Sequence, residues 1–185
     1  MNLREKLRTF RPHNSQEEAD CAEILWQLDN SEALYHREFP AHLTASAWVV
    51  SPDRTQVLMA YHNLYNSWAW LGGHADGETD LLSAAMREVR EESGLEDVRP
   101  VSEDIFSVEV LTVEGHVKRG AYVPSHLHLN VTYLLEADEE DELHIKPDEN
   151  SGVRWFALDE AVQACSEPWM RRHVYAKLNR KLLSL

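Results

Sequence analysis

Three glutamates near the middle of the chain have a spacing that suits metal chemistry. On an α-helix Glu88, Glu91 and Glu92 fall within an arc of roughly 100°. Like charges placed in this way repel one another and weaken an isolated helix. A hard divalent cation between them would offset that cost, because Mg²⁺ and Mn²⁺ prefer oxygen ligands. The spacing therefore indicates a divalent-metal site, and an ordinary helix with a solvated acidic face is the alternative.

The helix that positions these carboxylates has recognisable ends and an apolar face. Thr79 is expected to cap its N-terminus, with Asp80 in the first turn favoured by the helix dipole. Gly94 is expected to end it in the left-handed conformation. The glycine pair Gly72-Gly73 lets the backbone approach an ion or a phosphate closely. The apolar face to be buried is formed by Leu82, Ala85, Met86 and Val89.

The stretch from Gly72 to Leu95, GGHADGETDLLSAAMREVREESGL, resembles the box of the Nudix hydrolase (MutT-like) superfamily, Gly-x5-Glu-x7-Arg-Glu-apolar-x-Glu-Glu-x-Gly-apolar. Gly73 matches the first glycine, and residues 87–95 match the second half in register. One fixed position departs, because Thr79 stands where the family has Glu. The resemblance implies an α/β fold of the Nudix type, an α/β/α sandwich with a mixed sheet.

The resemblance also implies an activity and its residues. It implies a Mg²⁺- or Mn²⁺-dependent pyrophosphohydrolase that cleaves a nucleoside diphosphate linked to another moiety. Arg87 is expected to orient the glutamates. Glu91 and Glu149 are the two candidate general bases, and Glu149 has a turn or cap as its alternative role. The expected metal ligands are Glu88, Glu91, Glu92 and the carbonyl of Gly72.

Candidate substrate-binding residues lie on both sides of the box. A strand expected over residues 125–135 has a polar face with His126 and His128, which either borders the cleft or is an ordinary solvated face. Two histidines at i and i+2 with no nearby third ligand are weak evidence for a metal site. Lys118 and Arg119 could bind phosphate, or they are surface charges. Trp70 could stack on a base, or it closes the core.

Further elements surround this centre. The pattern Ser15-Gln16-Glu17-Glu18 predicts a helix that runs to about Asn30. Pro168 suits the first turn of a final helix whose basic residues, Lys177 and Lys181 among them, are expected to form a solvated face. Strands are expected before and after the central helix. The organisation predicted from this order is an N-terminal helical extension over residues 1–40 and a Nudix hydrolase domain over residues 41–185.

Composition limits the function classes. The chain has 185 residues, 43% of them hydrophobic and 27% charged, as in soluble globular proteins. Its net charge of −14 argues against binding to nucleic acid or an anionic membrane. Cys21 and Cys165 are expected to be buried thiols, and with no secretory signal this predicts a cytoplasmic protein. The expected partner is a small nucleotide substrate, and a homodimer is compatible with the sequence.

Two other classes of function share the fold implied by the resemblance. Non-catalytic nucleotide sensors tend to have eroded acidic residues, whereas the three glutamates of this chain are all present. Prenyl-diphosphate isomerases have a similar Gly-His segment but need a cysteine close to it. Both Cys21 and Cys165 are remote from that segment in the sequence.

Overall fold

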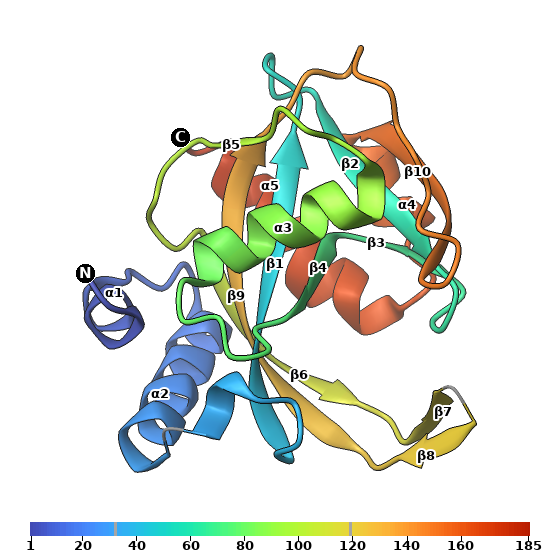
Figure 1. The fold of residues 1–185 in the computed structure, drawn as a ribbon. Helices are drawn as coiled ribbons and strands as arrows, with labels where there is room; N and C mark the ends of the chain where they lie inside the picture. Colours follow the sequence, from blue (N-terminus) through green and yellow to red (C-terminus); the bar gives the residue numbers. More distant parts are fainter. Residues whose placement is uncertain (32, 119) are drawn as a thin grey trace.

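A mixed β-sheet lies between two helical layers in the computed structural model, which describes residues 1–31, 33–118 and 120–185 (Figure 1). β1 pairs in parallel with β9, and the other pairings in the sheet are antiparallel. Its main path runs β10 (Asn150–Ala157), β2 (Gln56–His62), β1 (Ala41–Val50), β9 (His126–Glu136) and β5 (Arg99–Pro100). The shorter strands are β3 (Ser67–Ala69) on β2, β4 (Leu71–His74) on β1, β6 (Ser107–Val113) on β9, and a separate hairpin of β7 (His116–Lys118) and β8 (Ala121–Val123).

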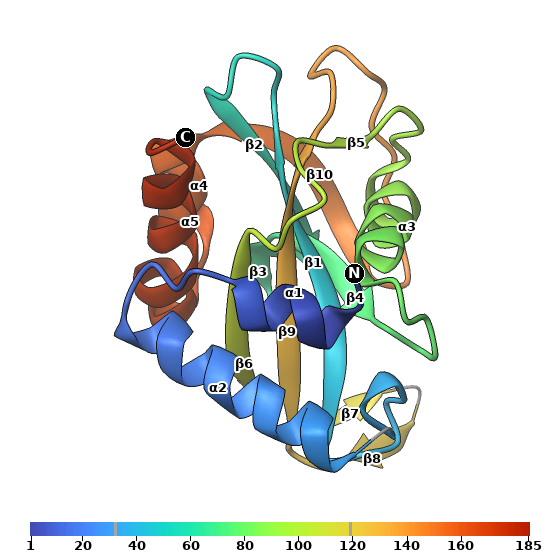
Figure 2. The same cartoon turned by 90° about the vertical axis from the view of Figure 1, so that its left-hand side faces the viewer.

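The helices cover both faces of this sheet. Figure 2 shows α3 (Leu81–Ser93) on one side and the C-terminal helices on the other, which confirms the expected sandwich. Those helices are α4 (Leu158–Ala164), the π-helix η2 (Met170–Tyr175) and α5 (Ala176–Leu182). The N-terminal elements are α1 (Leu3–Thr9), α2 (Ser15–Asn30) and the 3₁₀ turn η1 (Ala33–Tyr35). None of the helices in the described ranges is long and apolar enough to span a bilayer.

β1 is the strand that joins the two layers. Leu43 and Ala45 face the apolar cluster under α3, whereas Trp48 and Val50 face the cluster under α4 and α5. Successive side chains of a strand point to opposite faces, and a strand covered on both faces reads as a nearly continuous apolar run. This explains why β1 is buried along almost its whole length.

The N-terminal helices share the core of the sheet. Ile24 and Leu28 of α2 belong to the same buried cluster as the apolar face of α3. The helix expected from Ser15 to Asn30 is present, but its cap is Asn14, whose side chain accepts a hydrogen bond from the Glu17 amide at 2.9 Å. The boundary between residues 40 and 41 stays a prediction. Both cysteines are buried free thiols, as expected.

A buried network of charges ties α2, β6 and α5 together. Lys177 of α5 is fully buried, with Nζ 2.9 Å from Oε1 of Glu109 and 3.3 Å from Oε1 of Glu17. Nζ of Lys181 lies 2.8 Å from the same Glu17 oxygen. The expectation of a solvated basic face was therefore wrong for these two lysines. Buried carboxylates on other elements are their partners, because a charge this deep must be paired.

The N-terminus of α3 also differs from the expectation. Asp80, and not Thr79, is the cap. One oxygen of Asp80 accepts from the amides of Leu82 at 3.2 Å and Ser83 at 3.5 Å, and the other accepts from the Ser83 hydroxyl at 2.8 Å. Both residue types are good caps, so the sequence placed the start of the helix one residue too early.

The buried network predicts a large effect for one lysine. Lys177→Met removes the charge that compensates Glu17 and Glu109, and should lower the free energy of unfolding by about 3–5 kcal/mol. Urea denaturation followed by circular dichroism measures this loss. Arg180→Met, at an exposed position of the same helix, is the control and should change stability by less than about 0.5 kcal/mol. Equal effects of the two substitutions would contradict a buried ionic network.

The corrected cap predicts unequal effects at two neighbouring positions. Asp80→Ala removes the acceptor for the first amides of α3 and should cost about 0.5–2 kcal/mol of stability, the usual range for a cap. Thr79→Ala should cost less, because its exposed side chain does not cap the helix. Thermal unfolding of the two variants and wild type compares them. A larger loss of stability for Thr79→Ala than for Asp80→Ala would show that Thr79 caps the helix.

Candidate metal and catalytic site

Two glutamates of α3 lie directly against the glycine pair of β4. The backbone N–H of Gly72 donates to Oε2 of Glu92 at 3.0 Å. A Cβ atom on Gly73 would lie only 2.5 Å from Cδ of Glu88, and one on Gly72 only 2.5 Å from the Ala45 carbonyl oxygen. Larger residues would therefore clash with Glu88 on one side and with β1 on the other. The glycines are required for the close approach of α3 and the sheet.

A third carboxylate joins these two from a distant part of the sequence. Glu149 lies in the loop before β10, and one oxygen each from Glu88, Glu92 and Glu149 lie within 4.8 Å of one another. Asn150 holds this loop to α3, since its side-chain amide donates to the Glu92 carbonyl at 2.9 Å. Three oxygen donors gathered in this way fit a divalent cation of the Mg²⁺ class.

Glu91, expected as a metal ligand, lies outside that group of three. Its side chain is exposed, and its Oε2 lies 2.9 Å from Nζ of Lys146. The same ammonium group lies 3.1 Å from Oε2 of Glu149. Lys146 thus bridges the two candidate bases. No pattern in the sequence indicated this lysine, because its contact with α3 depends on the path of a long loop.

Arg87 has the contacts that an orienting role requires. Its Nη1 donates to Oε1 of Glu88 at 2.7 Å and reaches Oε1 of Glu91 at 3.5 Å. Its Nη2 donates to the carbonyl oxygen of His74 at 3.4 Å, which links α3 to the end of β4. The guanidinium group of Arg87 therefore fixes the position of the buried Glu88 and the exposed Glu91 with respect to β4.

Burial and crowding shift the protonation of the carboxylates. Burial raises the pKa of Glu88, and Arg87 partly offsets this effect. For Glu92, burial is the main cause of a pKa raised to about 8, and the negative charges of Glu88 and Glu149 add to it. The hydrogen bond from Lys146 lowers the pKa of the exposed Glu91 instead. Burial therefore disfavours the charged forms of Glu88 and Glu92, and raised carboxylate pKa values of this kind are typical of functional sites.

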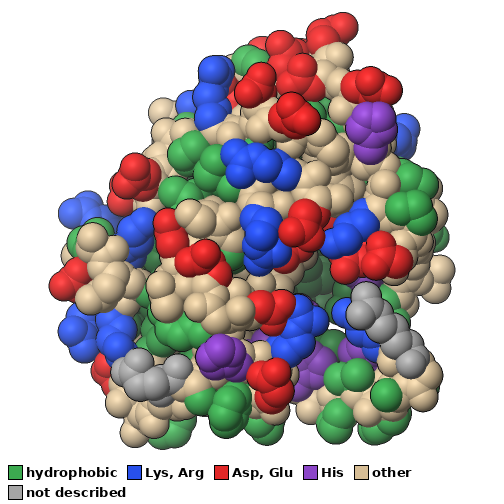
Figure 3. All heavy atoms as spheres, in the orientation of Figure 1, with side chains coloured by type: hydrophobic (Ala, Val, Ile, Leu, Met, Phe, Trp, Pro, Cys, Tyr) green, Lys and Arg blue, Asp and Glu red, His purple; other side chains and the backbone are tan. Residues whose placement is uncertain are grey.

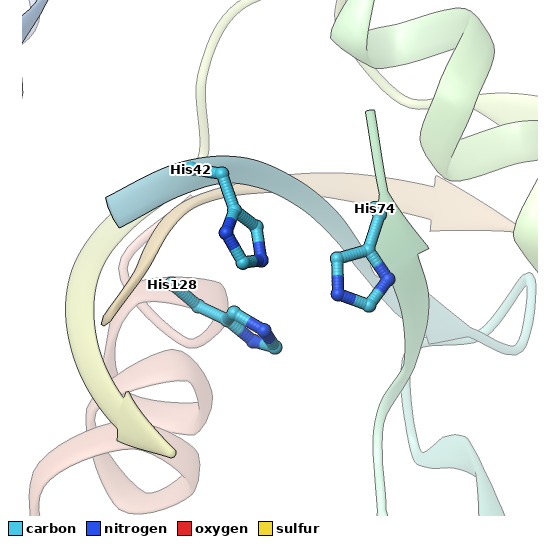
Figure 4. Close-up of side chains that lie close together, drawn as sticks. All are labelled: His42, His74 and His128. Carbon is cyan, nitrogen blue, oxygen red and sulfur yellow. The ribbon is translucent and has the colours of Figure 1, made fainter. Parts of the chain in front are cut away.

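The histidines of β9 have neighbours that the sequence did not reveal. His128 lies beside His42 of β1 and His74 of β4, and one ring nitrogen from each of these three lies within 4.8 Å of the others (Figure 4). His126 contacts His128, with the two Nε2 atoms 3.2 Å apart. The view that no third ligand lies near this pair was therefore wrong. Sequence spacing missed the cluster because three different strands supply it.

The other substrate-binding candidates lie in different places. Lys118 is exposed on β7. Burial is the main cause of the lowered pKa values of His74 and His128, and the positive charge of Lys118 adds a small contribution. In Figure 3, histidine side chains gather beside the hollow that separates the hairpin from the body of the molecule. Trp70 donates its backbone N–H to Oη of Tyr175 at 3.2 Å, and the two rings stack edge to face, which favours core packing. Arg119 lies outside the described residues.

Comparison of this sequence with known protein families identifies the family to which it belongs. The family model described as the NUDIX domain matches residues 40–178. Over 98 residues the chain is 32% identical to the asymmetrical bis(5'-nucleosyl)-tetraphosphatase of Rattus norvegicus, an alignment that spans 52% of this chain and 59% of the rat protein.

Two solved structures have a similar fold. An Ap4A hydrolase of C. elegans in a binary complex aligns with a TM-score of 0.54 and 20% identity, over 77% of this chain and 95% of that one. The Nudix hydrolase RenU of M. smegmatis aligns with a TM-score of 0.56 and 18% identity, over 80% of this chain and 89% of that one. The family match covers the whole sheet, α3 and the loop with Glu149. This chain belongs to the NUDIX domain family.

Proposed function

We propose that this protein is a pyrophosphohydrolase that depends on a divalent metal and cleaves a nucleoside diphosphate linked to another moiety. The observation that supports this most strongly is the group formed by Glu88, Glu92 and Glu149, two of which are buried. Nudix hydrolases generally use divalent metals, and the oxygen-only donor set favours Mg²⁺ or Mn²⁺. We propose these three carboxylates as the ligands, with the carbonyl of Gly72 as a further candidate.

The residues around the proposed metal site have different roles in the reaction. A bound divalent cation supplies positive charge to the phosphate oxygens and makes water more acidic. Arg87 orients Glu88, and the Gly72 amide orients Glu92. Glu91 and Glu149 are the candidate bases, and Lys146 forms an ion pair with each of them. Separate Glu91→Gln and Glu149→Gln variants distinguish them, because loss of the base removes the acidic limb of the pH–rate profile.

The rat relative suggests which substrate class to test first. The rat relative is named for its action on bis(5'-nucleosyl)-tetraphosphates, so dinucleoside polyphosphates are the first class to test. Of the substrate-binding candidates, the exposed Lys118 is the donor proposed for phosphate oxygens near the hairpin, whereas both ring nitrogens of His126 already have partners. A hydrolysis screen should cover nucleoside triphosphates, nucleotide sugars, dinucleotides and coenzymes. Identification of the products by mass spectrometry locates the bond that is cut.

Two rival functions are separated by the same screen. A nucleotide sensor would bind one of these compounds with no turnover in Mg²⁺ or Mn²⁺. A prenyl-diphosphate isomerase requires a reactive cysteine, but burial raises the pKa of both Cys21 and Cys165, which disfavours the thiolate. The cytoplasmic location, the homodimer and the absence of nucleic-acid binding stay predictions.

Loss of one buried carboxylate should remove most of the activity. Glu92→Gln or Glu88→Gln should lower kcat by at least about 10²-fold on the best substrate at saturating Mg²⁺. This is the loss expected when one charged group that stabilises the transition state is removed. Glu96→Gln, at an exposed position just beyond α3, is the matched control and should keep wild-type kcat. Near-normal turnover in both site variants would place catalysis elsewhere.

The raised pKa of Glu92 predicts how metal and pH act together. In the folded protein the pKa of Glu92 is raised from its ordinary value of 4.5 to about 8. Protonated Glu92 therefore contributes its full stability below about pH 4.5, and this contribution is lost as the pH rises through about 8. The metal-free protein should therefore lose stability from pH 5 to pH 8. Added Mg²⁺ or Mn²⁺ should raise Tm more at pH 8 than at pH 6.

Glu92→Gln is the control for this linkage. Its amide does not titrate, so its metal-free stability should depend less on pH across the same range. Differential scanning calorimetry of both proteins, with and without metal, gives the comparison. A metal-induced rise in Tm that is larger at pH 6 than at pH 8 would show that Glu92 is not the titrating ligand.

A further inference from the structure

Three histidines from three strands of the sheet turn their rings toward one another (Figure 4). They are His42 of β1, His74 of β4 and His128 of β9. Their ring centroids lie 5.0–5.1 Å apart in every pair. Histidine is the commonest metal ligand among side chains. The arrangement brings three imidazole donors to one point.

The hydrogen bonding of His42 leaves one ring nitrogen free at this point. Nδ1 of His42 lies 2.8 Å from the carbonyl oxygen of Phe39, so Nδ1 carries the proton and Nε2 carries a lone pair. The residue is 2% exposed, and within the described part of the chain Nε2 has no hydrogen-bond partner. A buried polar atom without a partner costs free energy. A backbone carbonyl on the opposite nitrogen is the usual support of a metal-binding histidine.

His126 supports the second ring in a similar way. Its Nδ1 lies 2.8 Å from the Pro124 carbonyl oxygen, and its Nε2 lies 3.2 Å from Nε2 of His128. These contacts connect the His128 ring to the backbone through one intermediate ring and fix its orientation. Burial lowers the pKa of His42 and of His128, so both rings are neutral at pH 7. Neutral imidazole is the form that binds metals.

We propose that His42, His74 and His128 form a second metal site, which binds a transition-metal ion of the Zn²⁺ class. The donor set contains nitrogen only, which suits Zn²⁺, Co²⁺ or Ni²⁺ and does not suit Mg²⁺. Bonds of about 2.0–2.1 Å from nitrogen to Zn²⁺ require the three rings to move closer together than in the structure. Three protein ligands leave a fourth position open, as in catalytic zinc sites.

Strand β4 connects this site to the carboxylate site. His74 directly follows Gly73, which packs against Glu88, and Arg87 contacts the His74 carbonyl. Lys118 adds positive charge nearby. The histidine site is thus one residue along β4 from the glycine that packs against the carboxylates, on the opposite face of the sheet. Metal binding itself does not depend on hydrolysis, so it is tested separately from the proposed function.

Metal uptake in excess Mg²⁺ tests this proposal. Metal-stripped wild-type protein is dialysed against micromolar Zn²⁺ or Co²⁺, and bound metal is measured by atomic absorption. We expect one ion per chain, with a visible Co²⁺ spectrum of the kind given by tetrahedral nitrogen ligands. His74→Ala and His42→Gln should each weaken the affinity at least about 10-fold. His13→Ala, at an exposed histidine, is the matched control and should leave uptake unchanged.

A further variant separates the two metal sites. The double variant Glu88→Gln, Glu92→Gln should keep the Zn²⁺, because its histidines are intact. Circular dichroism checks that the variants fold, and NMR of the histidine rings in wild type reports the ligands directly. The proposal is overturned if wild type retains no Zn²⁺ in excess Mg²⁺. It is equally overturned if the double variant loses the ion while His74→Ala keeps it.

Discussion

The contact between the glutamates of α3 and the glycines of β4 is the constraint on which the candidate site depends. Glu88 fits over Gly73 only because that position has no Cβ atom, and Glu92 is held by the Gly72 amide. This contact removes both carboxylates from water and brings them close to Glu149. Arg87 compensates part of this charge at Glu88, and protons or a bound cation would compensate the rest. The close packing of a helix on a strand thus creates the demand for a metal.

Strand alternation separates two chemically different groups of donors. Gly73 and His74 are neighbours in β4, so the position of Gly73 faces α3 while His74 faces the opposite side. His42 lies on the same face of β1 as Trp48 and Val50, which pack under the C-terminal helices. Oxygen donors therefore gather on the side of α3, and nitrogen donors gather on the other. Strand β4, with its two glycines, connects the oxygen donors to the nitrogen donors. Arg87 contacts the side chain of Glu88 in the first group and the backbone carbonyl of His74 in the second.

Local spacing made part of this site predictable. Glu88, Glu92 and the glycine pair lie within one short segment, and the spacing of residues on a helix places the carboxylates without knowledge of the rest of the chain. The order of strands and helices along the chain predicted the sandwich, and the family resemblance of the same segment implied the same fold. Lys146 and the partners of His128 were not predictable, because they come from other elements. Lys177 looked like a surface residue for a related reason, since the carboxylates that pair with it belong to α2 and β6.

The buried ionic network has a consequence for how the protein is made. A ribosome releases Glu17 and Glu109 well before Lys177 emerges, so for most of synthesis these two carboxylates lack the ammonium group that allows their burial. The parallel pairing of β1 with β9 also joins segments far apart in sequence, and such high contact order slows folding. Nascent chains that end before α5 should therefore stay open and sensitive to proteases. We therefore expect α2 to dock stably against the sheet only after α5 has brought Lys177 to Glu17 and Glu109.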